Sequence, residues 1–319
     1  RIKREIGGKD IDFRVSALPG NHGESMVLRI LRPDAVNIGI QALGFEQDDY
    51  ERFQRIIKRP NGIFLVTGPT GSGKTTTLYA ALLELNKSDK KIITAEDPVE
   101  YNFPGINQCQ IRDEIGLSFD MILRAMLRQA PNIILVGEIR DGIVADIAIQ
   151  AALTGHLVFS TLHTNDAVSA ITRLIDMGVK PLLVASSIQA IMAQRLVRVI
   201  CKNCKVVDEE PDPYYLQLLD IKPEDIKRHP VYKGAGCSQC QGTGFKGRIG
   251  VFEMVELTNE LRELAFAKAP TNELRQASVA GGMKTLMDDG KRKIFKGTTT
   301  PKEVAAISQV ESVLREQTG

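Results

Sequence analysis

A glycine-rich run at residues 68–75 limits what this chain can fold into more than any other stretch. It reads Gly-Pro-Thr-Gly-Ser-Gly-Lys-Thr and matches the pattern G-x-x-x-x-G-K-S/T. The apolar run Ile63 to Val66 before it predicts a buried strand, and residues 76–85 after it predict a helix. In such a unit, backbone N–H groups and the helix N-terminus face an anion. This order favours a nucleotide-binding loop over a glycine-rich turn that matches by chance.

The same run supplies side chains suited to a nucleoside triphosphate and its Mg²⁺. Lys74 is expected to reach the β- and γ-phosphates, and the Thr75 hydroxyl is expected to ligate Mg²⁺. The predicted nucleotide-binding residues are Gly68, Pro69, Thr70, Gly71, Ser72, Gly73, Lys74, Thr75 and Thr76.

The composition excludes some classes of protein. With 41 basic and 39 acidic residues and no Trp, the chain carries no general signal for nucleic-acid binding. The most apolar long segment, Val179 to Ile200, contains Lys and Arg and does not predict a membrane-spanning helix. Its 319 residues leave room for two domains. Because residue 1 is Arg, we expect an excised fragment from which a targeting signal could have been removed.

The first part of the chain predicts a strand hairpin. Apolar side chains recur with the period of a strand at Ile11, Phe13 and Val15 and again at Met26, Leu28 and Ile30. Residues 19–21, Pro-Gly-Asn, predict the turn between them. Arg14 and Arg29 fall on the opposite faces, where the residues alone favour a solvated surface. Residues 33–44 are expected to be a linker and 48–58 a short helix.

Acidic residues follow two further predicted strands. The strand 91–95 ends in Glu-Asp-Pro-Val-Glu, which contributes Glu96, Asp97 and Glu100. Carboxylates beside a phosphate loop suit Mg²⁺ ligation or water activation. The strand 133–136 ends at Gly137 and Glu138, with Gly in the position where Asp is commoner. Glu138 is therefore the acid expected to hold Mg²⁺ from the far side of the nucleotide.

A histidine follows the predicted strand 157–161. A lone His is more often structural, but three strand ends here already carry phosphate chemistry, which favours contact of His163 with the γ-phosphate. The strands alternate with expected helices, which predicts a mainly parallel sheet with its ligand at the carboxyl ends of the strands. These helices run from Ser118 to Pro131, from the N-cap Asp141 to Leu153, from Asp166 to Met177 and from Pro181 to Leu196.

The composition of the chain changes after residue 200, where two C-x-x-C pairs occur. The pairs are separated by 32 residues, with an expected helical insert at 213–229, and consist of Cys201 and Cys204, then Cys237 and Cys240. Four thiolates suit Zn²⁺, whereas the alternatives are two disulfides or a redox pair. An intracellular nucleotide motor would keep these thiols reduced, which favours a zinc site over two disulfides. Cys109 is unpaired, and helices are expected from Val255 onward, one of them capped by Thr300.

Four stretches together resemble the signatures of the secretion superfamily of hexameric RecA-like ATPases. They are the glycine-rich loop 68–75, residues 95–101 (Ala-Glu-Asp-Pro-Val-Glu-Tyr), residues 136–141 (Val-Gly-Glu-Ile-Arg-Asp) and residues 154–165, which end in Leu-His-Thr-Asn. Residues 14–19 and 23–29 also look like the family's second N-terminal domain. The chain is most similar to extension ATPases of type IV pilus assembly (PilB-like) and their type II secretion relatives (GspE-like). One departure is residues 129–132, which lack acids that relatives often carry.

The resemblance implies an α/β fold with a RecA-like P-loop NTPase core. A mainly parallel sheet would be preceded by the end of an N-terminal α/β domain and followed by a four-cysteine zinc module and a C-terminal helical region. The expected division is 1–36 for the N-terminal hairpin with arginine fingers, 37–44 for a linker, 45–200 for the ATPase core, 201–245 for the zinc module and 246–319 for the helical region.

The resemblance also assigns roles. ATP, Mg²⁺ and Zn²⁺ are the implied cofactors, with Thr75 and Glu138 on Mg²⁺. Glu100 is the candidate to polarise the attacking water, although the reverse assignment of Glu100 and Glu138 stays open. Arg14 and Arg29 would reach the γ-phosphate, which replaces the surface interpretation. The catalytic set is thus Glu100, Glu138, Arg14, Arg29 and His163.

The implied protein is a homohexameric ATP-hydrolysing motor of type IV pilus assembly. It would lie in the cytoplasm at the inner face of the bacterial inner membrane, held there by an inner-membrane platform protein. A type II secretion ATPase remains an alternative, as does a pilus retraction ATPase, although retraction ATPases usually lack the four-cysteine insert. A nucleic-acid translocase would show polynucleotide-stimulated hydrolysis. A further alternative is a non-enzymatic scaffold gated by ATP. Such a scaffold would keep Lys74 for nucleotide binding but would not need the catalytic acids and arginines. No nucleic-acid partner is expected.

Overall fold

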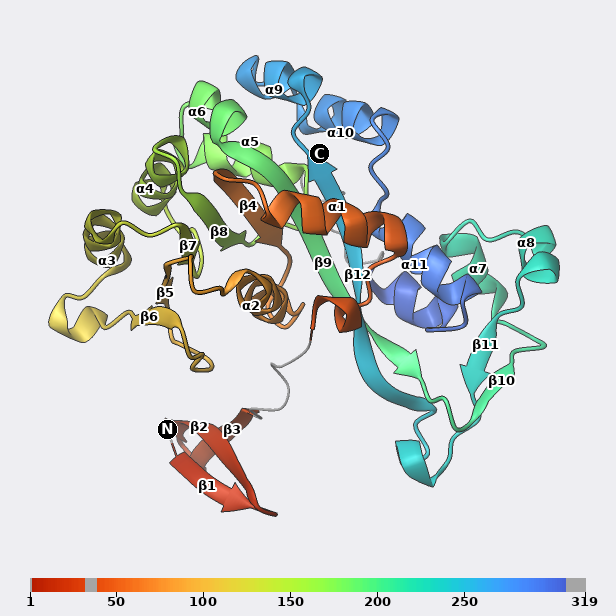
Figure 1. Cartoon of the computed structure of the whole chain (residues 1–319). Coiled ribbons are helices and arrows are strands. Elements are labelled where there is room, and N and C mark those ends of the chain that lie inside the picture. The colour runs from red at the N-terminus through yellow and green to blue at the C-terminus, as the bar shows by residue number, and fades with distance from the viewer. Residues whose placement is uncertain (1, 32–38, 308–319) are drawn as a thin grey trace.

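The structure is a computed structural model that describes residues 2–31 and 39–307. Figure 1 shows three parts: a small N-terminal sheet, a large α/β unit, and a module of short strands and helices on the far side of that unit. Within the described ranges, none of the helices combines the length and the apolar character needed to cross a membrane.

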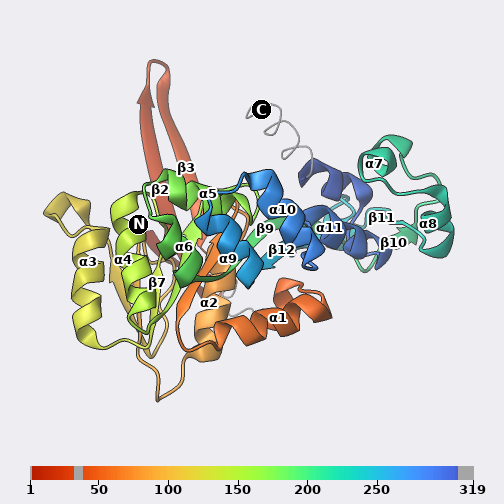
Figure 2. The ribbon, with the colours of Figure 1, turned by 90° about the horizontal axis from the view of Figure 1, so that it is seen from above.

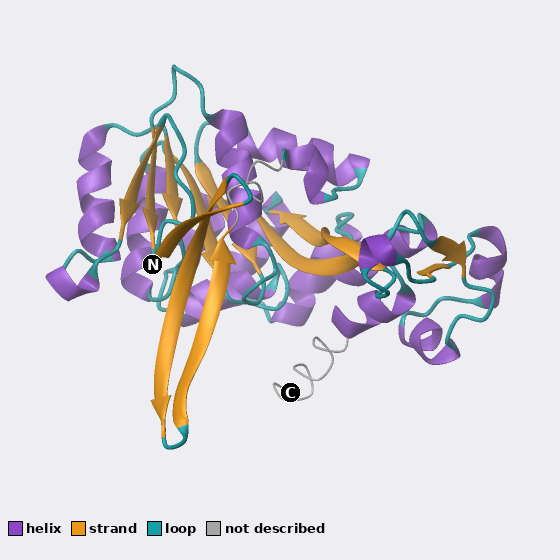
Figure 3. Cartoon of the chain, turned by 90° about the horizontal axis from the view of Figure 1, so that it is seen from below, coloured by secondary structure: helices purple, strands orange, loops and turns teal. Residues whose placement is uncertain are grey.

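The N-terminal sheet contains the predicted hairpin and one additional strand. Its antiparallel strands are β1 (Ile2–Ile6), β2 (Lys9–Gly20) and β3 (Gly23–Leu31), and the β2–β3 ribbon projects from the rest of the chain (Figure 3). Gly20 pairs with Gly23, so the turn consists of Asn21 and His22 rather than residues 19–21. Arg14 lies directly opposite Arg29 in the register of the two strands.

The expected linker ends in a docked turn. Residues 32–38 lie outside the described ranges, whereas η2 (Ile40–Leu43) is a 3₁₀ turn whose Ile40 and Leu43 are buried. The linker prediction is therefore wrong at its carboxyl end, because these apolar side chains pack on the core. The helix expected at 48–58 is α1 (Gln47–Ile57).

A seven-stranded sheet forms the centre of the α/β unit. Its order is β12-β9-β4-β8-β7-β5-β6, and all neighbouring strands are parallel except β12, which is antiparallel to β9. The mainly parallel sheet predicted from the sequence is thus confirmed. The strands are β4 (Gly62–Thr67), β5 (Ile92–Glu96), β6 (Ile106–Gln110), β7 (Ile133–Val136), β8 (Leu157–Leu162), β9 (Ile188–Ile200) and β12 (Phe245–Glu256).

Helices cover both faces of this sheet (Figure 2). One face packs against α1 and α2 (Lys74–Leu85). The other packs against α3 (Phe119–Met126), α4 (Gly142–Leu153), α5 (Ser169–Asp176), α6 (Pro181–Ser187), α9 (Asn259–Phe266) and α10 (Thr271–Ala280). The expected cap of α4 is present, because the Asp141 carboxylate accepts a hydrogen bond from the Val144 N–H at 2.9 Å.

The helix predicted from Pro181 to Leu196 is wrong. Only α6 is helical, and the chain then continues as the strand β9 for 13 residues. Its Ala, Gln and Met residues favour helix in isolation, but β9 lies inside the sheet between β4 and β12 and is buried along most of its length. Tertiary pairing therefore overrides the local preference.

The module after residue 200 packs on the C-terminal helices. It contains β10 (Lys205–Val207), α7 (Pro213–Leu218), α8 (Pro223–Arg228) and β11 (Tyr232–Gly234), so the helical insert expected at 213–229 is present. Its buried Leu219, Ile221 and Val231 form a small core with Ile294 of α11 (Leu286–Phe295) and with Val304. The helix at 301–307 begins at the predicted cap, where the Thr300 hydroxyl accepts from the Glu303 N–H at 3.4 Å.

Candidate functional site

A cavity of about 550 Å³ lies at the carboxyl ends of the parallel strands. The glycine-rich loop forms one wall, and the ends of β5, β7 and β8 supply Glu100, Glu138 and His163 to the others. Because parallel strands present their carboxyl ends at one edge of a sheet, residues far apart in sequence meet here. The structure therefore brings together the acids, the histidine and the loop that the sequence analysis selected.

The glycine-rich loop has the shape of an anion cradle. Gly68 has a φ of 142°, and a Cβ at this position would lie 2.5 Å from the Gln194 carbonyl oxygen and 2.7 Å from Ser72 Oγ. Glycine is required there because β9 approaches the loop so closely. Ser72 Oγ is buried and has no hydrogen-bond partner among the described residues. A buried hydroxyl without a partner, just before the N-terminus of α2, fits a bound phosphate chain.

Lys74 is folded over the loop that precedes it. Its Nζ donates to the Gly68 carbonyl at 2.7 Å and to the Pro69 carbonyl at 3.2 Å. Burial lowers the pKa of Lys74, while the nearby Glu138 opposes that shift. An anion in the cavity would stabilise the charged form of Lys74, because it would replace the solvation lost on burial.

Glu138 lies within a network of charged side chains. Its Oε2 is 3.2 Å from His163 Nε2, and its other oxygen accepts from the Arg140 guanidinium. Arg140 also donates to Asp97 Oδ2 at 3.2 Å, so it links the ends of β5 and β7. A Cβ at Gly137 would lie 3.1 Å from the Ala95 carbonyl oxygen, so a side chain here would require the ends of β5 and β7 to shift by a few tenths of an ångström.

Glu100 connects the cavity to the N-terminal sheet. The two terminal nitrogens of Arg14 contact its two carboxylate oxygens at 3.2 and 3.0 Å. Arg14 Nη1 donates a hydrogen bond to Glu100, whereas Nη2 makes an ion pair with it that lacks hydrogen-bond geometry. Arg29 lies opposite Arg14 on β3 and is exposed. The structure therefore shows a contact at the cavity for Arg14, the first of the two predicted arginines.

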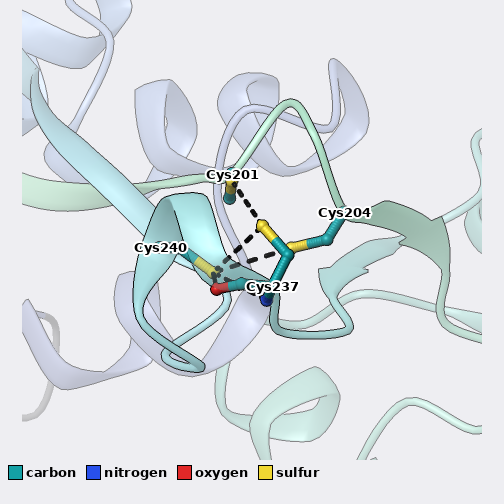
Figure 4. A group of neighbouring side chains, drawn as sticks. All are labelled: Cys201, Cys204, Cys237 and Cys240. Atoms are coloured by element: carbon teal, nitrogen blue, oxygen red, sulfur yellow. Dashed lines mark hydrogen bonds between the residues drawn. The ribbon is translucent and has the colours of Figure 1, made fainter.

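The four cysteines form a compact cluster away from the cavity (Figure 4). All four Sγ atoms lie within 4.8 Å of one another, and the shorter separations are 3.7 and 3.8 Å. A tetrahedral zinc with bonds of about 2.3 Å requires sulfur separations of about 3.8 Å, whereas a disulfide bond requires about 2 Å. The fifth cysteine, Cys109, is half-buried in β6.

Hydrogen bonds to sulfur favour the thiolate at Cys237 and Cys240, whereas burial raises the pKa of Cys204. The Asn203 side-chain amide donates to Cys237 Sγ at 3.3 Å and lowers the pKa of Cys237 to about 6. The Gly244 N–H donates to Cys240 Sγ at 3.3 Å. Donors aimed at sulfur stabilise the charged form that binds metal. The donor set and its geometry therefore fit Zn²⁺.

Several residues at the site were missed by the sequence analysis. The Gln194 side chain accepts from the Thr77 hydroxyl at 2.8 Å, and Arg195 donates to the Asn165 carbonyl at 2.7 Å. Both lie on β9, so the erroneous helix concealed their place beside the loop. Arg140 was part of a quoted signature, but no local signal indicated that it joins two strand ends.

The fold and the site define a P-loop nucleotide-binding protein with a parallel α/β sheet. The family described as "Type II/IV secretion system protein" matches residues 1–310, and the chain belongs to this family. Over 306 residues the chain is 46% identical to the type IV pilus assembly ATPase PilB of Thermus thermophilus, covering 96% of this chain and 34% of that protein.

Relatives from both branches of the family are similar to the chain. It is 47% identical over 305 residues to PilB of Myxococcus xanthus, covering 95% of this chain and 54% of that protein. It is 46% identical over 312 residues to type II secretion system protein E of Pectobacterium carotovorum, covering 98% and 61%. The chain therefore spans between a third and about three fifths of the length of these relatives.

Solved structures support the fold. The pilus retraction motor PilT with bound ADP matches with a TM-score of 0.69 and 26% identity, over 96% of this chain and 76% of that chain. The Legionella pneumophila ATPase DotB matches with a TM-score of 0.66 and 22% identity, over 97% and 76%, which supports the fold alone.

Replacement of Lys74 by Ala is expected to weaken binding of ATP by about tenfold or more, since a charged hydrogen bond contributes about 1.5–3 kcal/mol. Titration with a fluorescent ATP analogue measures this affinity. Lys87→Ala removes an exposed lysine that follows α2 and serves as the matched control. Equal affinity of the Lys74 variant and the parent would exclude Lys74 from the nucleotide site.

Proposed function

We propose that this chain is the motor part of a homohexameric ATPase that powers type IV pilus assembly. The observation that carries the proposal is the meeting of Lys74, Glu100, Glu138 and His163 around one cavity. The identity to pilus assembly ATPases, 46% and 47%, supports this activity over other uses of a phosphate loop. The five-part division of the chain expected from the sequence is kept as part of the proposal, except that residues 40–43 pack on the core and residues 246–256 lie in the central sheet as part of β12.

The proposed chemistry assigns each side chain to one part of the triphosphate. Residues 68–76 hold the phosphates, with Lys74 on the β- and γ-phosphates. Thr75 and Glu138 would hold Mg²⁺, which would supply positive charge to neutralise the phosphates. Glu100 polarises the attacking water, and His163, which contacts Glu138 at 3.2 Å, faces the γ-phosphate.

The arginines are proposed to act as fingers that stabilise the charge of the transition state. Arg14 already reaches the cavity wall through Glu100, and Arg29 is its neighbour in the sheet. In a closed ring, motion of this sheet relative to the cavity would couple hydrolysis to rotation between subunits.

The work of the ring is proposed to be the extraction and polymerisation of pilin. The machine would lie in the cytoplasm, at the inner face of the inner membrane, where a platform protein holds it. The four-cysteine module is proposed to carry a structural Zn²⁺, because four thiolates leave no open coordination position.

Type II secretion is the second candidate function. Relatives named type II secretion system protein E are as similar to this chain as the pilus ATPases, at 46% for the Pectobacterium protein. The membrane partner separates the two candidates, so affinity capture of the platform protein from native membranes decides between them. Capture of a secretion platform would replace the pilus assignment and leave the proposed chemistry in place.

Glu100→Gln and Glu138→Gln are each expected to lower turnover by on the order of a hundredfold or more while ATP still binds. Each change removes a negative charge and nearly preserves the shape of the side chain. Phosphate release, measured beside nucleotide affinity, tests this, and Glu84→Gln on the exposed side of α2 is the control. Turnover of the Glu100 variant at the parent rate would shift water activation to Glu138.

Arg14→Ala and Arg29→Ala are each expected to lower ATP turnover by about a thousandfold, as the loss of an arginine finger does in related phosphoryl transfer. Circular dichroism should show that the hairpin stays folded. Arg4→Ala, on the exposed part of β1, is the control within the same sheet. Near-normal turnover in both variants would return these arginines to the solvated surface.

Elemental analysis of protein purified under reducing conditions is expected to find about one zinc per chain, as a closed four-thiolate site requires. Cys204→Ser or chelation should accelerate hydrogen exchange across residues 201–245 and leave ATP affinity unchanged. Cys109→Ser, outside the cluster, should leave both the metal content and the exchange unchanged. Protein that lacks metal while this module stays protected would rule out the zinc site.

A further inference from the structure

The buried carboxylate of Glu96 lies at the end of β5, just before the loop that carries Glu100. It is 4% exposed and accepts hydrogen bonds from the Tyr79 hydroxyl, from Thr94 Oγ1 at 2.6 Å and from Gln108 Nε2 at 3.2 Å. A buried carboxylate with three donors is a fixed point in the structure, because moving it would leave charge and donors unsatisfied. None of these donors belongs to the catalytic set described above.

Tyr79 joins this fixed point to the backbone of Glu100. Its hydroxyl donates to Glu96 and accepts from the Glu100 N–H at 3.3 Å. Tyr79 lies on α2, four residues after Thr75, so it occupies the same side of the helix one turn further on. One phenol group thus connects the helix of the phosphate loop to the residue proposed to activate water. Burial raises the pKa of Tyr79, which keeps the hydroxyl protonated and able to donate.

Gln108 holds the other half of the same loop. From the edge strand β6 its amide nitrogen donates to the Tyr101 carbonyl at 2.8 Å, and its amide oxygen accepts from the Phe103 N–H at 2.8 Å. The Phe103 ring meets the Tyr79 ring edge to face, with centroids 4.9 Å apart. Residues 100–103 are therefore held at three backbone positions by two side chains that share one carboxylate.

We propose that Tyr79 and Gln108, anchored on Glu96, are positioning residues that hold the backbone of Glu100 at a fixed distance from the phosphate loop. This inference rests on the proposed role of Glu100 in water activation. A general base must lie within hydrogen-bond reach of its water, and a displacement of about 1 Å can cost about a hundredfold in rate. Tyr79 ties α2 to this loop at Glu100, whereas Asn86, the C-cap residue of α2, ties it only further along, by donating to the Pro104 carbonyl at 2.9 Å.

Tyr79→Phe tests the inference because it removes only the hydroxyl and keeps the ring against Phe103. Turnover should fall by on the order of tenfold to a hundredfold, with the affinity for a non-hydrolysable ATP analogue within about twofold of the parent. Hydrogen exchange of a peptide covering residues 97–105 should accelerate, and exchange in β4 should not change. Tyr50→Phe removes a phenol hydroxyl from α1, outside the cavity, and should behave as the parent.

The same change in a Glu100→Gln background separates positioning from general damage. If Tyr79 acts through Glu100, Tyr79→Phe should cost less than about twofold there under single-turnover conditions. If Tyr79→Phe lowers turnover by a similar factor in both backgrounds, the inference is wrong. It is also wrong if Tyr79→Phe alone turns over like the parent while Glu100→Gln is inactive. Parent-like turnover of Glu100→Gln itself would instead overturn the proposed role of Glu100.

Gln108→Ala provides a second variant should Tyr79→Phe fail to fold. It removes the ties to Tyr101 and Phe103 without changing α2. It should also lower turnover by about tenfold, preserve nucleotide affinity and lose its effect in the Glu100→Gln background. Gln150→Ala on the exposed side of α4 is its control. Turnover of Gln108→Ala at the parent rate with faster exchange in 97–105 would show that the position of this loop does not limit catalysis.

Discussion

The parallel pairing of β4 with β8 on one side and β9 on the other is the constraint on which the rest of the structure depends. All six residues of β4 are buried, and its register with both neighbours sets where Gly68 leaves the sheet. Because β5 and β7 run in the same direction, their acids leave the sheet at the same edge. A single antiparallel strand in the middle of this sheet would send one of these acids to the opposite edge.

Local signals predicted the parts of the fold that depend on short stretches of sequence. The phosphate loop, the strands that end in acids, the cap at Asp141 and the cysteine pairs all have patterns within a few residues. The strand β6 had none, because it lies at the sheet edge and reads Ile-Asn-Gln-Cys-Gln, with too few apolar residues to show an alternation. Its Gln108 could not be assigned for the same reason.

Contacts between distant segments could not be predicted from the sequence. Gln194 lies beside the phosphate loop only because β9 pairs with β4, and its helix-like composition concealed that pairing. Arg14 and Glu100 are 86 residues apart in the chain, and the contact between them depends on how the N-terminal sheet is placed. The four cysteines, by contrast, were found as a set because each pair is a local pattern and metal chemistry accounts for both.

The four-cysteine module is carried on the same strand that borders the phosphate loop. The first half of β9, to Ala193, pairs with β4, whereas the second half continues to Ile200 alongside β12 alone. Cys201 follows immediately, and Phe245 of β12 returns opposite Ile200. The module is thus joined to the core by a two-stranded arm whose base lies next to Gly68, and it is also held by its packing against Ile294 of α11.

Arg14 already has an anionic partner at the cavity. Both of its terminal nitrogens are already on the Glu100 carboxylate. Under the proposed roles, an arriving γ-phosphate replaces one anion by another at the same guanidinium, and the arginine keeps a counter-ion throughout. Because a terminal phosphate carries about two negative charges and a carboxylate one, this exchange would strengthen the attraction at the guanidinium and leave the Glu100 carboxylate without its cation. Under the proposed roles, the N-terminal sheet would then respond to which of the two anions Arg14 contacts.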